Sequence, residues 1–317
     1  MTTILVTGAS GFVGHNLCSE LVRQGHKVRG VVRDLSRAAG LQCELVAVRS
    51  IENDVDWSSK LDSIEVVVHL AARVHVMHDT EADPLAAFRA VNVEGTLSLA
   101  RQAAVAGVKR FVFISSVKVN GECTQPGHVF TEADAPAPQD AYGVSKHEAE
   151  VGLRQLAEDT SMEVVIIRPP LVYGPGVKAN FAALMRAVQR GWPLPLSAVH
   201  NQRSLVSLDN LVDFIVTCVS HPQASNQTFL VCDGQDMSTN ELVRGMAQAV
   251  GRPARLLPVP VWALQAGAAL LGKGDEAQRL CGNLQVDISK ARSLLGWMPP
   301  VSVTEGLKTT ALGLTQD

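Results

Sequence analysis

A glycine-rich loop near the start of the chain is the feature that most constrains its fold. The stretch TILVTGASGFVG places Gly8, Gly11 and Gly14 between an apolar run and an amphipathic segment. The first glycine permits a tight turn, the second lets the backbone approach a pyrophosphate, and the third lets a helix pack closely on a sheet. Backbone N–H groups at the helix start then face the phosphates. The loop predicts dinucleotide binding, with Phe12 and Val13 among the contacting residues.

The first half of the chain alternates short β-branched runs with helix-like segments. The runs predict strands over Thr3–Thr7, Lys27–Val32, Glu44–Val48, Val66–Leu70, Arg110–Ser115 and Glu163–Ile167. The segments predict helices over Gly14–Gln24, Pro84–Ala106 and Ala141–Asp159. Near-continuous apolar strands that alternate with helices are typical of a parallel sheet covered on both faces. We therefore expect an α/β fold with a doubly wound, Rossmann-type parallel sheet.

The pattern of the sequence changes from Pro169 onward: Pro and Gly residues become frequent, and the predicted helices and strands become shorter. We interpret residues 1–168 as a dinucleotide-binding domain and residues 169–317 mainly as a smaller lobe that binds the substrate. Because no clean linker separates the two, we expect them to interleave.

Charge and composition give little support to several classes of partner. The 317 residues carry a formal net charge of −3 and are 46% hydrophobic but only 4% aromatic. This balance gives no reason to propose a nucleic acid or an anionic membrane as partner. The start lacks a basic flank followed by an apolar targeting segment, and the longest apolar stretch, Val259–Leu271, is too short to span a bilayer. We therefore expect a cytoplasmic protein.

The cysteines and histidines do not indicate a metal site. The six cysteines form no C-x-x-C pair, which favours reduced thiols. His75 and His78 are three residues apart, but no third ligand follows at a suitable spacing. We expect no bound metal.

A tyrosine and a lysine four residues apart indicate proton transfer. Tyr142 and Lys146 fall on one face of a predicted helix, so the ammonium is expected beside the phenol, where it lowers the phenol pKa toward working pH. Such a pair can protonate a carbonyl that is being reduced or accept a proton from an alcohol that is being oxidised. Ser115 ends the fifth predicted strand and Ser116 comes next, at the edge where ligands of open α/β folds bind.

Together, the glycine loop, the strand-end serine and the Tyr–Lys helix resemble the extended short-chain dehydrogenase/reductases, and within them the nucleotide-sugar epimerase/dehydratase branch. The resemblance implies that Tyr142 is the acid/base and that Lys146 holds the nicotinamide ribose and tunes the phenol. It implies that Ser116 bonds the reacting oxygen at C4 of the sugar. It also implies cofactor contacts from Ala71, Ala72, Asn92, Ser115 and Pro169.

The residues after the second predicted strand bear on the choice of cofactor. An acidic residue about 20 positions beyond the glycine loop usually binds the ribose hydroxyls. Here Arg33 suits a 2′-phosphate, whereas Asp34 suits a 2′-hydroxyl. We expect NAD(P)(H), with a slight preference for NADP(H).

The residues after Ser116 bear on the sugar chemistry. Dehydratases of the family place an Asp-Glu pair there, whereas this chain has Val117 and Lys118, so 4,6-dehydration lacks its acid and base. The stretches around Ser116 and after Arg168 resemble bacterial 4-keto-reductases that make UDP-N-acetyl-quinovosamine-type sugars for surface polysaccharides. We therefore favour reduction of a UDP-4-keto-6-deoxy-N-acetylhexosamine. The alternative is a 4-epimerase of UDP-glucose or UDP-N-acetylglucosamine.

The resemblance also implies how a UDP-sugar is held. The candidate substrate contacts are Ser116, Lys118, Asn180, Arg203 and Arg279. The two arginines suit a diphosphate because the guanidinium is a planar fork of donors. Family members commonly pair the two longest predicted helices, which implies a homodimer. A non-catalytic dinucleotide sensor is the remaining alternative, although a sensor has no need of a proton donor.

Overall fold

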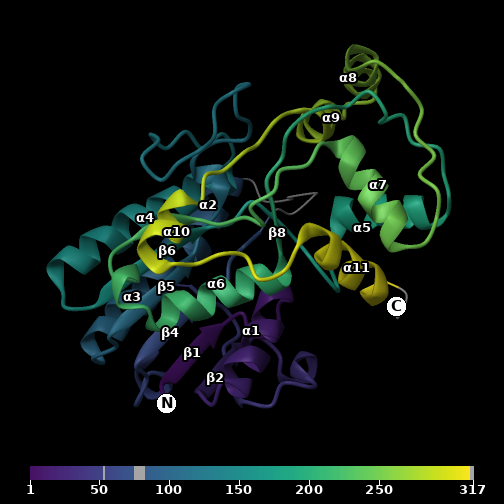
Figure 1. Cartoon of the computed structure of the whole chain (residues 1–317). Helices are drawn as coiled ribbons and strands as arrows, with labels where there is room; N and C mark the ends of the chain where they lie inside the picture. The colour runs from purple at the N-terminus through teal and green to yellow at the C-terminus, as the bar shows by residue number, and fades with distance from the viewer. Residues whose placement is uncertain (53, 75–82, 315–317) are drawn as a thin grey trace.

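Runs of buried β-branched residues form one parallel sheet. The computed structural model describes residues 1–52, 54–74 and 83–314, and within them the sheet has seven strands (Figure 1). In spatial order the strands are β3 (Glu44–Ala47), β2 (Lys27–Val32), β1 (Thr3–Thr7), β4 (Val66–His69), β5 (Arg110–Ile114), β6 (Glu163–Arg168) and β9 (Thr228–Leu230). Every pairing is parallel, so their carboxyl ends share one edge. The predicted doubly wound, Rossmann-type sheet is confirmed.

Alternate residues of each strand face opposite layers of helices. On β1, Ile4 and Val6 pack into one apolar core and Leu5 into the other, as the two-residue period of a strand requires. The first core is covered by α1 (Phe12–Arg23), α6 (Leu208–Ser220) and α10 (Ser289–Leu295), and the second by α3 (Thr96–Val105) and α4 (Ala141–Asp159). Burial on both faces explains why the strands read as near-continuous apolar runs.

Most predicted element ends agree with the structure within two residues. The helix α4 has the predicted bounds, and α1 begins at Phe12 rather than Gly14. Three predicted strand ends, Val48, Leu70 and Ser115, lie one residue beyond the strands. The Val48 and Ser115 nitrogens still donate to the neighbouring strands, both at 2.8 Å, and the loops of the carboxyl edge begin after them.

The helix predicted over Pro84–Ala106 is divided in three. Its parts are α2 (Pro84–Arg89), the π-helical segment η3 (Ala90–Gly95) and α3. An added Cβ at Gly95 would lie 2.1 Å from the carbonyl oxygen of Ile51, so this segment packs at backbone distance on a preceding loop. Inserted π turns concentrate at functional sites, and this one carries Asn92.

Residues after Pro169 build a second lobe and also return to the sheet. The lobe has its own apolar core, to which α5 (Ala179–Gln189), α7 (Thr239–Ala249) and α11 (Val303–Gly313) contribute. Its other elements are the parallel pair β7 (Leu171–Tyr173) and β8 (Leu205–Ser207), with α8 (Val261–Leu270) and α9 (Gly274–Cys281). The single turns are η1 (Leu35–Ala38), η2 (Ser58–Lys60), η4 (Val117–Val119) and η5 (Pro222–Ala224). Between the lobe elements, α6, β9 and α10 pack with the sheet (Figure 1).

A buried carboxylate on α4 joins the helix to two strand ends. Glu150 is fully buried and accepts two hydrogen bonds from the Arg168 guanidinium, at 2.9 and 2.6 Å. It also accepts from the Ser115 hydroxyl (2.6 Å) and from Arg154 (2.7 Å). Burial opposes ionisation, but the hydrogen bonds and charge of Arg168 outweigh it and lower the pKa of Glu150. The ends of β5 and β6 are thereby tied to α4.

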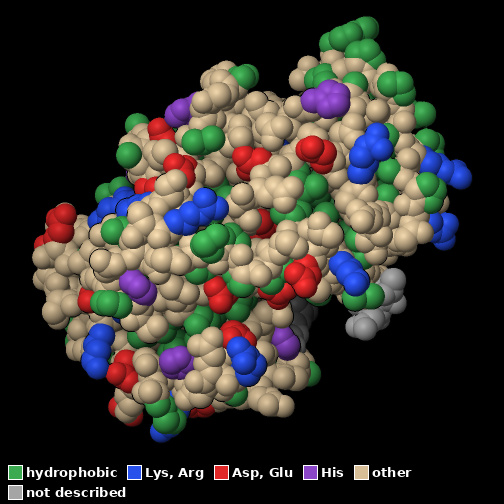
Figure 2. Space-filling model, in the orientation of Figure 1, with side chains coloured by type: hydrophobic (Ala, Val, Ile, Leu, Met, Phe, Trp, Pro, Cys, Tyr) green, Lys and Arg blue, Asp and Glu red, His purple; other side chains and the backbone are tan. Residues whose placement is uncertain are grey.

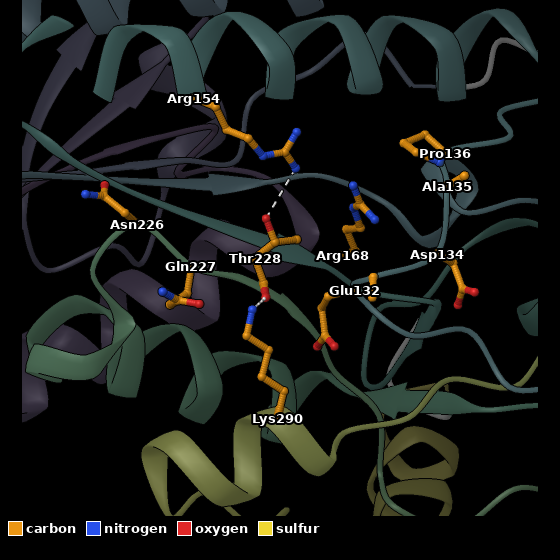
Figure 3. Close-up of a pocket in the computed structure, with 11 residues that line it drawn as sticks. Glu132, Asp134, Ala135, Pro136, Arg154, Arg168, Asn226, Gln227, Thr228 and Lys290 are labelled. Carbon is orange, nitrogen blue, oxygen red and sulfur yellow. Dashed lines mark hydrogen bonds between the residues drawn. The ribbon is translucent and has the colours of Figure 1, made fainter. Parts of the chain in front are cut away.

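Two of these arginines also line a polar pocket of about 400 Å³ at the β9 edge (Figure 3). Arg154 from α4, Arg168 from β6 and Lys290 from α10 reach it. Arg154 donates to the Thr228 hydroxyl (3.3 Å) and Lys290 to the Thr228 carbonyl oxygen (2.9 Å). These bonds fasten β9 to the elements beside it. None of the predicted catalytic residues lines this pocket.

Replacing Glu150 by Gln should destabilise the protein by about 3–5 kcal/mol, because it leaves the buried Arg168 guanidinium without its counter-charge. The matched control is Glu148→Gln on the same helix, which breaks a half-exposed pair with Arg89 and should cost less than about 1 kcal/mol. Urea unfolding at pH 7 measures both. Equal small losses in the two variants would show that the buried pair does not hold α4.

Candidate active site

Five strand ends place predicted site residues along one edge of the sheet. Gly8 follows β1, Arg33 follows β2, Ala71 lies just beyond β4, Ser115 follows β5 and Pro169 follows β6. In open α/β sheets, ligands bind at this edge beside the point where the strand order reverses. Here the reversal lies between β1 and β4, because β2 and β3 extend the sheet in one direction and β5 and β6 in the other.

The glycine loop leaves no room for side chains. Gly8 has a φ of +70°, and a Cβ added there would lie 3.0 Å from the backbone nitrogen of Ala71. A Cβ on Gly14 would lie 2.1 Å from the Gly8 carbonyl oxygen, so α1 packs on the loop at backbone distance. Gly11, which precedes α1, supplies no side-chain cap. No cap side chain therefore competes with an anion for the first N–H groups of the helix, and the cradle fits a dinucleotide pyrophosphate.

A neutral histidine holds the two strands behind this loop. His69 is fully buried, with Nδ1 2.8 Å from the Thr7 hydroxyl oxygen and Nε2 3.0 Å from that of Thr96. The Thr7 hydroxyl also accepts a hydrogen bond from the Ala71 nitrogen (3.2 Å). Burial, and then the charge of Lys146, lower the pKa of His69 to about 3. The ring is therefore neutral at pH 7, and its two hydrogen bonds position the walls of the cradle.

The predicted Tyr–Lys pair lies on α4, but the lysine bonds elsewhere. Lys146 Nζ donates to the Ile114 carbonyl oxygen (2.8 Å) and lies 4.5 Å from the Phe113 ring centroid, against 5.9 Å from that of Tyr142. Burial lowers the pKa of Lys146 to about 7. Burial also raises the pKa of Tyr142, and the Asp140 carboxylate adds to this rise. The expected lowering of the phenol pKa by Lys146 is thus not found in the free protein, because burial and Asp140 raise this pKa while the amine of Lys146 bonds the Ile114 carbonyl oxygen.

The turn that carries Ser116 packs on the first turn of α4. The Ser116 hydroxyl oxygen caps η4 by accepting from the Lys118 nitrogen (3.2 Å). A Cβ added to Gly143 would lie 3.0 Å from the Lys118 carbonyl oxygen. Asp140 caps α4 by accepting from the Gly143 nitrogen (2.7 Å). The strand-end hydroxyl and the phenol of Tyr142 therefore come from segments in contact.

Two residues that the resemblance assigns to the cofactor make structural hydrogen bonds. The buried Ser115 hydroxyl donates to Glu150. The buried Asn92 amide donates to the Ser145 hydroxyl oxygen and to the Arg73 carbonyl oxygen, both at 3.0 Å, and accepts from the Arg73 nitrogen (2.8 Å). Asn92 thus holds the chain beyond β4 against α4, and the cofactor contacts of both residues stay predictions.

Two of the predicted substrate residues converge on a carboxylate that the sequence analysis did not name. Glu122 Oε1 lies 3.2 Å from Lys118 Nζ and 3.9 Å from Arg279 Nη2. Lys118 also pairs with Asp140. The four-residue spacing of Lys118 and Glu122 indicates such a contact, and an aspartate just before a predicted helix indicates a cap. Both residues could therefore have been found from the sequence.

The remaining predicted substrate residues lie on the second lobe. Arg203 donates from Nη1 to the Gly282 carbonyl oxygen (3.0 Å). Burial and the nearby charge of Arg279 lower the pKa of Arg203, so two guanidinium groups lie within electrostatic reach of each other. Asn180 makes none of these contacts and is exposed on the first turn of α5.

The two residues that bear on cofactor choice are both exposed beyond β2. Asp34 caps η1 by accepting from the Ser36 nitrogen (2.9 Å). Arg33 is exposed beside it. Ala71 and Ala72 are half-buried in the loop that follows β4. The structure thus brings the predicted dinucleotide contacts to one edge.

In the described parts of the chain, no group of three or more His, Cys, Asp or Glu residues is suited to a metal ion. His75 and His78 lie outside the described residues. All six cysteines are free thiols. Among the helices that the structure describes, none is both long and apolar enough to cross a bilayer.

The sheet, the glycine cradle and the strand edge define a dinucleotide-binding protein of the Rossmann type. Residues 4–232, well over half of the chain, match the model of the NAD dependent epimerase/dehydratase family. The chain belongs to this family, as the resemblance in its sequence implied.

Individual relatives within this family show which activities similar proteins are named for. A UDP-glucose 4-epimerase of Vibrio cholerae is 53% identical over 317 residues, which cover 99% of this chain and 96% of the relative. An Escherichia coli O157:H7 protein named N-acetyl-alpha-D-glucosaminyl-diphospho-ditrans,octacis-undecaprenol 4-epimerase is 26% identical, with 97% of this chain and 93% of the relative covered. The solved structure of MoeE5 in complex with UDP-glucose and NAD is 27% identical, with a TM-score of 0.77 and 99% of each chain covered. The names of the first two relatives favour the 4-epimerase alternative over the 4-keto-reductase expected from the sequence.

Replacing Lys146 by Met should stabilise the fold near pH 7. The pKa of Lys146 is about 7 in the folded protein against an ordinary 10.5, so the unfolded chain binds more protons between these values. The cost of burying the charge is therefore full below pH 7 and is relieved as pH rises toward 10.5. The variant's gain in unfolding free energy should shrink over that window.

Urea unfolding at pH 6, 8 and 10 measures the effect of Lys146→Met. The control is Lys109→Met, which removes a largely exposed amine paired with Glu65 and should show no such pH-dependent gain. A Lys146→Met variant whose advantage grew with pH would contradict the assignment of a charge buried at a cost.

Proposed function

We propose that this protein is an NAD-dependent enzyme that inverts C4 of a UDP-linked hexose. The observation that supports the proposal is the contact between the Ser116 turn and the first turn of α4, because these two segments carry the predicted hydroxyl and the Tyr142 phenol. The 53% identity to a protein named UDP-glucose 4-epimerase supports the same reaction. The sensor alternative is less favoured, because it gives no reason for this arrangement.

In the proposed mechanism, Ser116 and Tyr142 bind the oxygen on C4 of the sugar, and Tyr142 holds or releases its proton. When bound, the nicotinamide supplies reversible hydride transfer. The raised pKa of Tyr142 keeps the phenol protonated in the free protein, the form that returns a proton to the C4 carbonyl oxygen in the second half of the reaction. In the first half, which oxidises the C4 hydroxyl, the phenol must have lost this proton so that it can accept the proton of the hydroxyl. Lys146 has a pKa of about 7, so it can gain or lose a proton at the working pH. That it tunes the phenol is what the family resemblance implies; in the free protein its amine donates to the Ile114 carbonyl oxygen.

The diphosphate of the substrate is proposed to bind between Arg203 and Arg279. Two neighbouring guanidinium groups repel each other, and a bound diphosphate relieves this repulsion through bidentate hydrogen bonds. Glu122 already balances part of the charge by its contacts with Arg279 and Lys118. Asn180 is the remaining candidate substrate contact, on the first turn of α5.

Five finer parts of the sequence interpretation remain proposals. The preference for NADP(H) rests on Arg33 alone, and MoeE5 was solved with NAD. The homodimer and a role in surface polysaccharide synthesis rest on the family resemblance, and the cytoplasmic location rests on the expectation of reduced cysteines. The division into a dinucleotide-binding domain over residues 1–168 and a substrate lobe over residues 169–317 is proposed with the same standing.

A substrate panel should distinguish the reactions. UDP-glucose, UDP-N-acetylglucosamine and a UDP-4-keto-6-deoxy-N-acetylhexosamine are each offered with NAD+, NADH or NADPH, and products are read by NMR. We expect C4 epimers of the first two sugars without net change in nicotinamide absorbance. Stoichiometric coenzyme oxidation confined to the 4-keto sugar would restore the reductase, and dinucleotide binding without turnover of any sugar would favour the sensor.

Replacing Tyr142 by Phe should lower turnover by about 10²–10⁴-fold, because it removes the proton carrier. The chain has only one other tyrosine, Tyr173, whose buried hydroxyl donates to Asp233 (2.7 Å). Tyr173→Phe is therefore the matched control, with lower stability but near-normal turnover per folded molecule. Steady-state rates and thermal unfolding are measured for both. Normal turnover in Tyr142→Phe would rule out the mechanism.

A further inference from the structure

The charge of the chain is divided unevenly between two parts of the molecule. Residues 169–208 and 242–274 contain eight Lys and Arg residues and no Asp or Glu. Because the whole chain has 28 basic and 31 acidic residues, the other residues carry 20 basic and all 31 acidic ones. The two carboxylate-free segments therefore have a charge of +8, and the rest of the chain has −11.

The two segments come together in the second lobe. Both contribute to its apolar core, and they are joined by a parallel bridge between Leu194 and Leu256 and by the hydrogen bond from the Ser197 nitrogen to the Leu257 carbonyl oxygen (3.1 Å). Seven of the eight basic side chains are exposed: Lys178, Arg186, Arg190, Arg244, Arg252, Arg255 and Lys273. Figure 2 shows blue side chains on this side of the molecule.

The helix α8 gives the same lobe an exposed apolar face. Val261 and Leu264 pack toward the lobe core. On the outer side, Trp262 is 73% exposed and Leu270 is 89% exposed, and Leu271 follows at 77%. The exposed positions of α8 are 262, 265, 266, 269 and 270, and they recur with the helical period, so they form one stripe that is apolar except at Gln265. Figure 1 places α8 at the outer tip of the lobe, and Figure 2 shows green side chains there.

Tryptophan and arginine extend this surface beyond the helix. Trp192 is 55% exposed, and the Arg190 guanidinium carbon lies 5.4 Å from its ring centroid. Of the four tryptophans, the two exposed ones, Trp192 and Trp262, both lie in the carboxylate-free segments. Indole rings favour a boundary between an apolar phase and water, since they join a large apolar body to one polar N–H group.

We propose that the outer face of α8, with the basic side chains around it, docks on the surface of an anionic lipid bilayer. Leucine side chains would enter the acyl boundary, the tryptophans would lie at headgroup level, and the cations would face lipid phosphates. The helix is too short to span a bilayer, so this is surface binding. The near-neutral total charge, which gave no reason to expect a membrane, conceals the local excess.

A second copy of this chain is the less favoured occupant. In a two-fold dimer each copy presents the same patch to the other. The seven exposed cations of the two segments would then meet their copies, with fewer exposed carboxylates on the lobe helices to balance them: Glu241, Glu276 and Glu305. Like charges brought together in this way repel, whereas an anionic bilayer supplies the counter-charge.

Vesicle flotation tests the proposal on the full chain. We expect binding to phosphatidylcholine vesicles that contain 30% phosphatidylglycerol, weaker binding at 500 mM than at 50 mM salt, and little binding to pure phosphatidylcholine. Leu270→Glu with Leu271→Glu should weaken binding at least about tenfold, because it removes the apolar contact. Arg252→Glu with Arg255→Glu should also weaken it at least about tenfold, at about 1 kcal/mol for each cation near the surface. Met298→Glu, at an exposed apolar residue (68%) outside the two segments, is the matched control and should bind like the natural chain.

Each variant is checked for thermal unfolding and for turnover of a water-soluble UDP-sugar, neither of which should change. Quenching of tryptophan fluorescence by brominated lipid gives a second readout, and it should fall in Trp262→Phe. Absence of flotation, equal binding to neutral vesicles, or wild-type binding by both double variants would overturn the proposal. So would concentration-dependent self-association in light scattering that the Leu270→Glu, Leu271→Glu variant abolishes, because α8 would then bind a second copy.

Discussion

The buried carboxylate of Glu150 is the contact on which the arrangement of the site depends. It binds the Ser115 hydroxyl and the Arg168 guanidinium from a helix that also carries Tyr142 and Lys146. Ser115 precedes Ser116, and Arg168 precedes the segment that leaves β6. One carboxylate therefore holds α4 against the ends of β5 and β6, so that Ser116, Tyr142 and Lys146 keep fixed relative positions. Its charge also partly opposes the loss of the Lys146 proton.

The same region buries ionisable side chains, at a cost in stability, beside the proposed reacting groups. Lys146 is held by one carbonyl oxygen and an aromatic ring, and burial lowers its pKa. Burial likewise keeps His69 neutral and raises the pKa of Tyr142. A site that only stabilised the fold would replace such groups by apolar ones, because buried charge is costly. Perturbed groups gathered at a ligand edge are typical of acid–base function.

The sequence predicted secondary structure correctly where the local pattern of apolar residues determines it. The six long strand predictions and α4 followed from period and apolar runs, because burial on both faces of a parallel sheet leaves that pattern. The three-residue strands β7, β8 and β9 carry too few residues for a pattern. The π segment around Asn92 depends on the close approach of Gly95 to Ile51, which is a tertiary contact. The pKa of Tyr142 could not be inferred either, because spacing placed Lys146 on its face but could not show that Ile114 would take the ammonium.

The total charge of the chain did not predict the basic surface of the second lobe, because it averages over segments that fold into different parts of the molecule. The absence of carboxylates from two segments distant in sequence becomes meaningful only when the bridge between Leu194 and Leu256 joins them in one lobe. That lobe also supplies Arg203, which lies half-buried and near Arg279 rather than among the outer cations. The two carboxylate-free segments of this lobe would thus serve anions on two sides, a diphosphate at the site and lipid phosphates at α8. If both proposals hold, an acidic residue on either side would weaken an anion contact without any cost to packing.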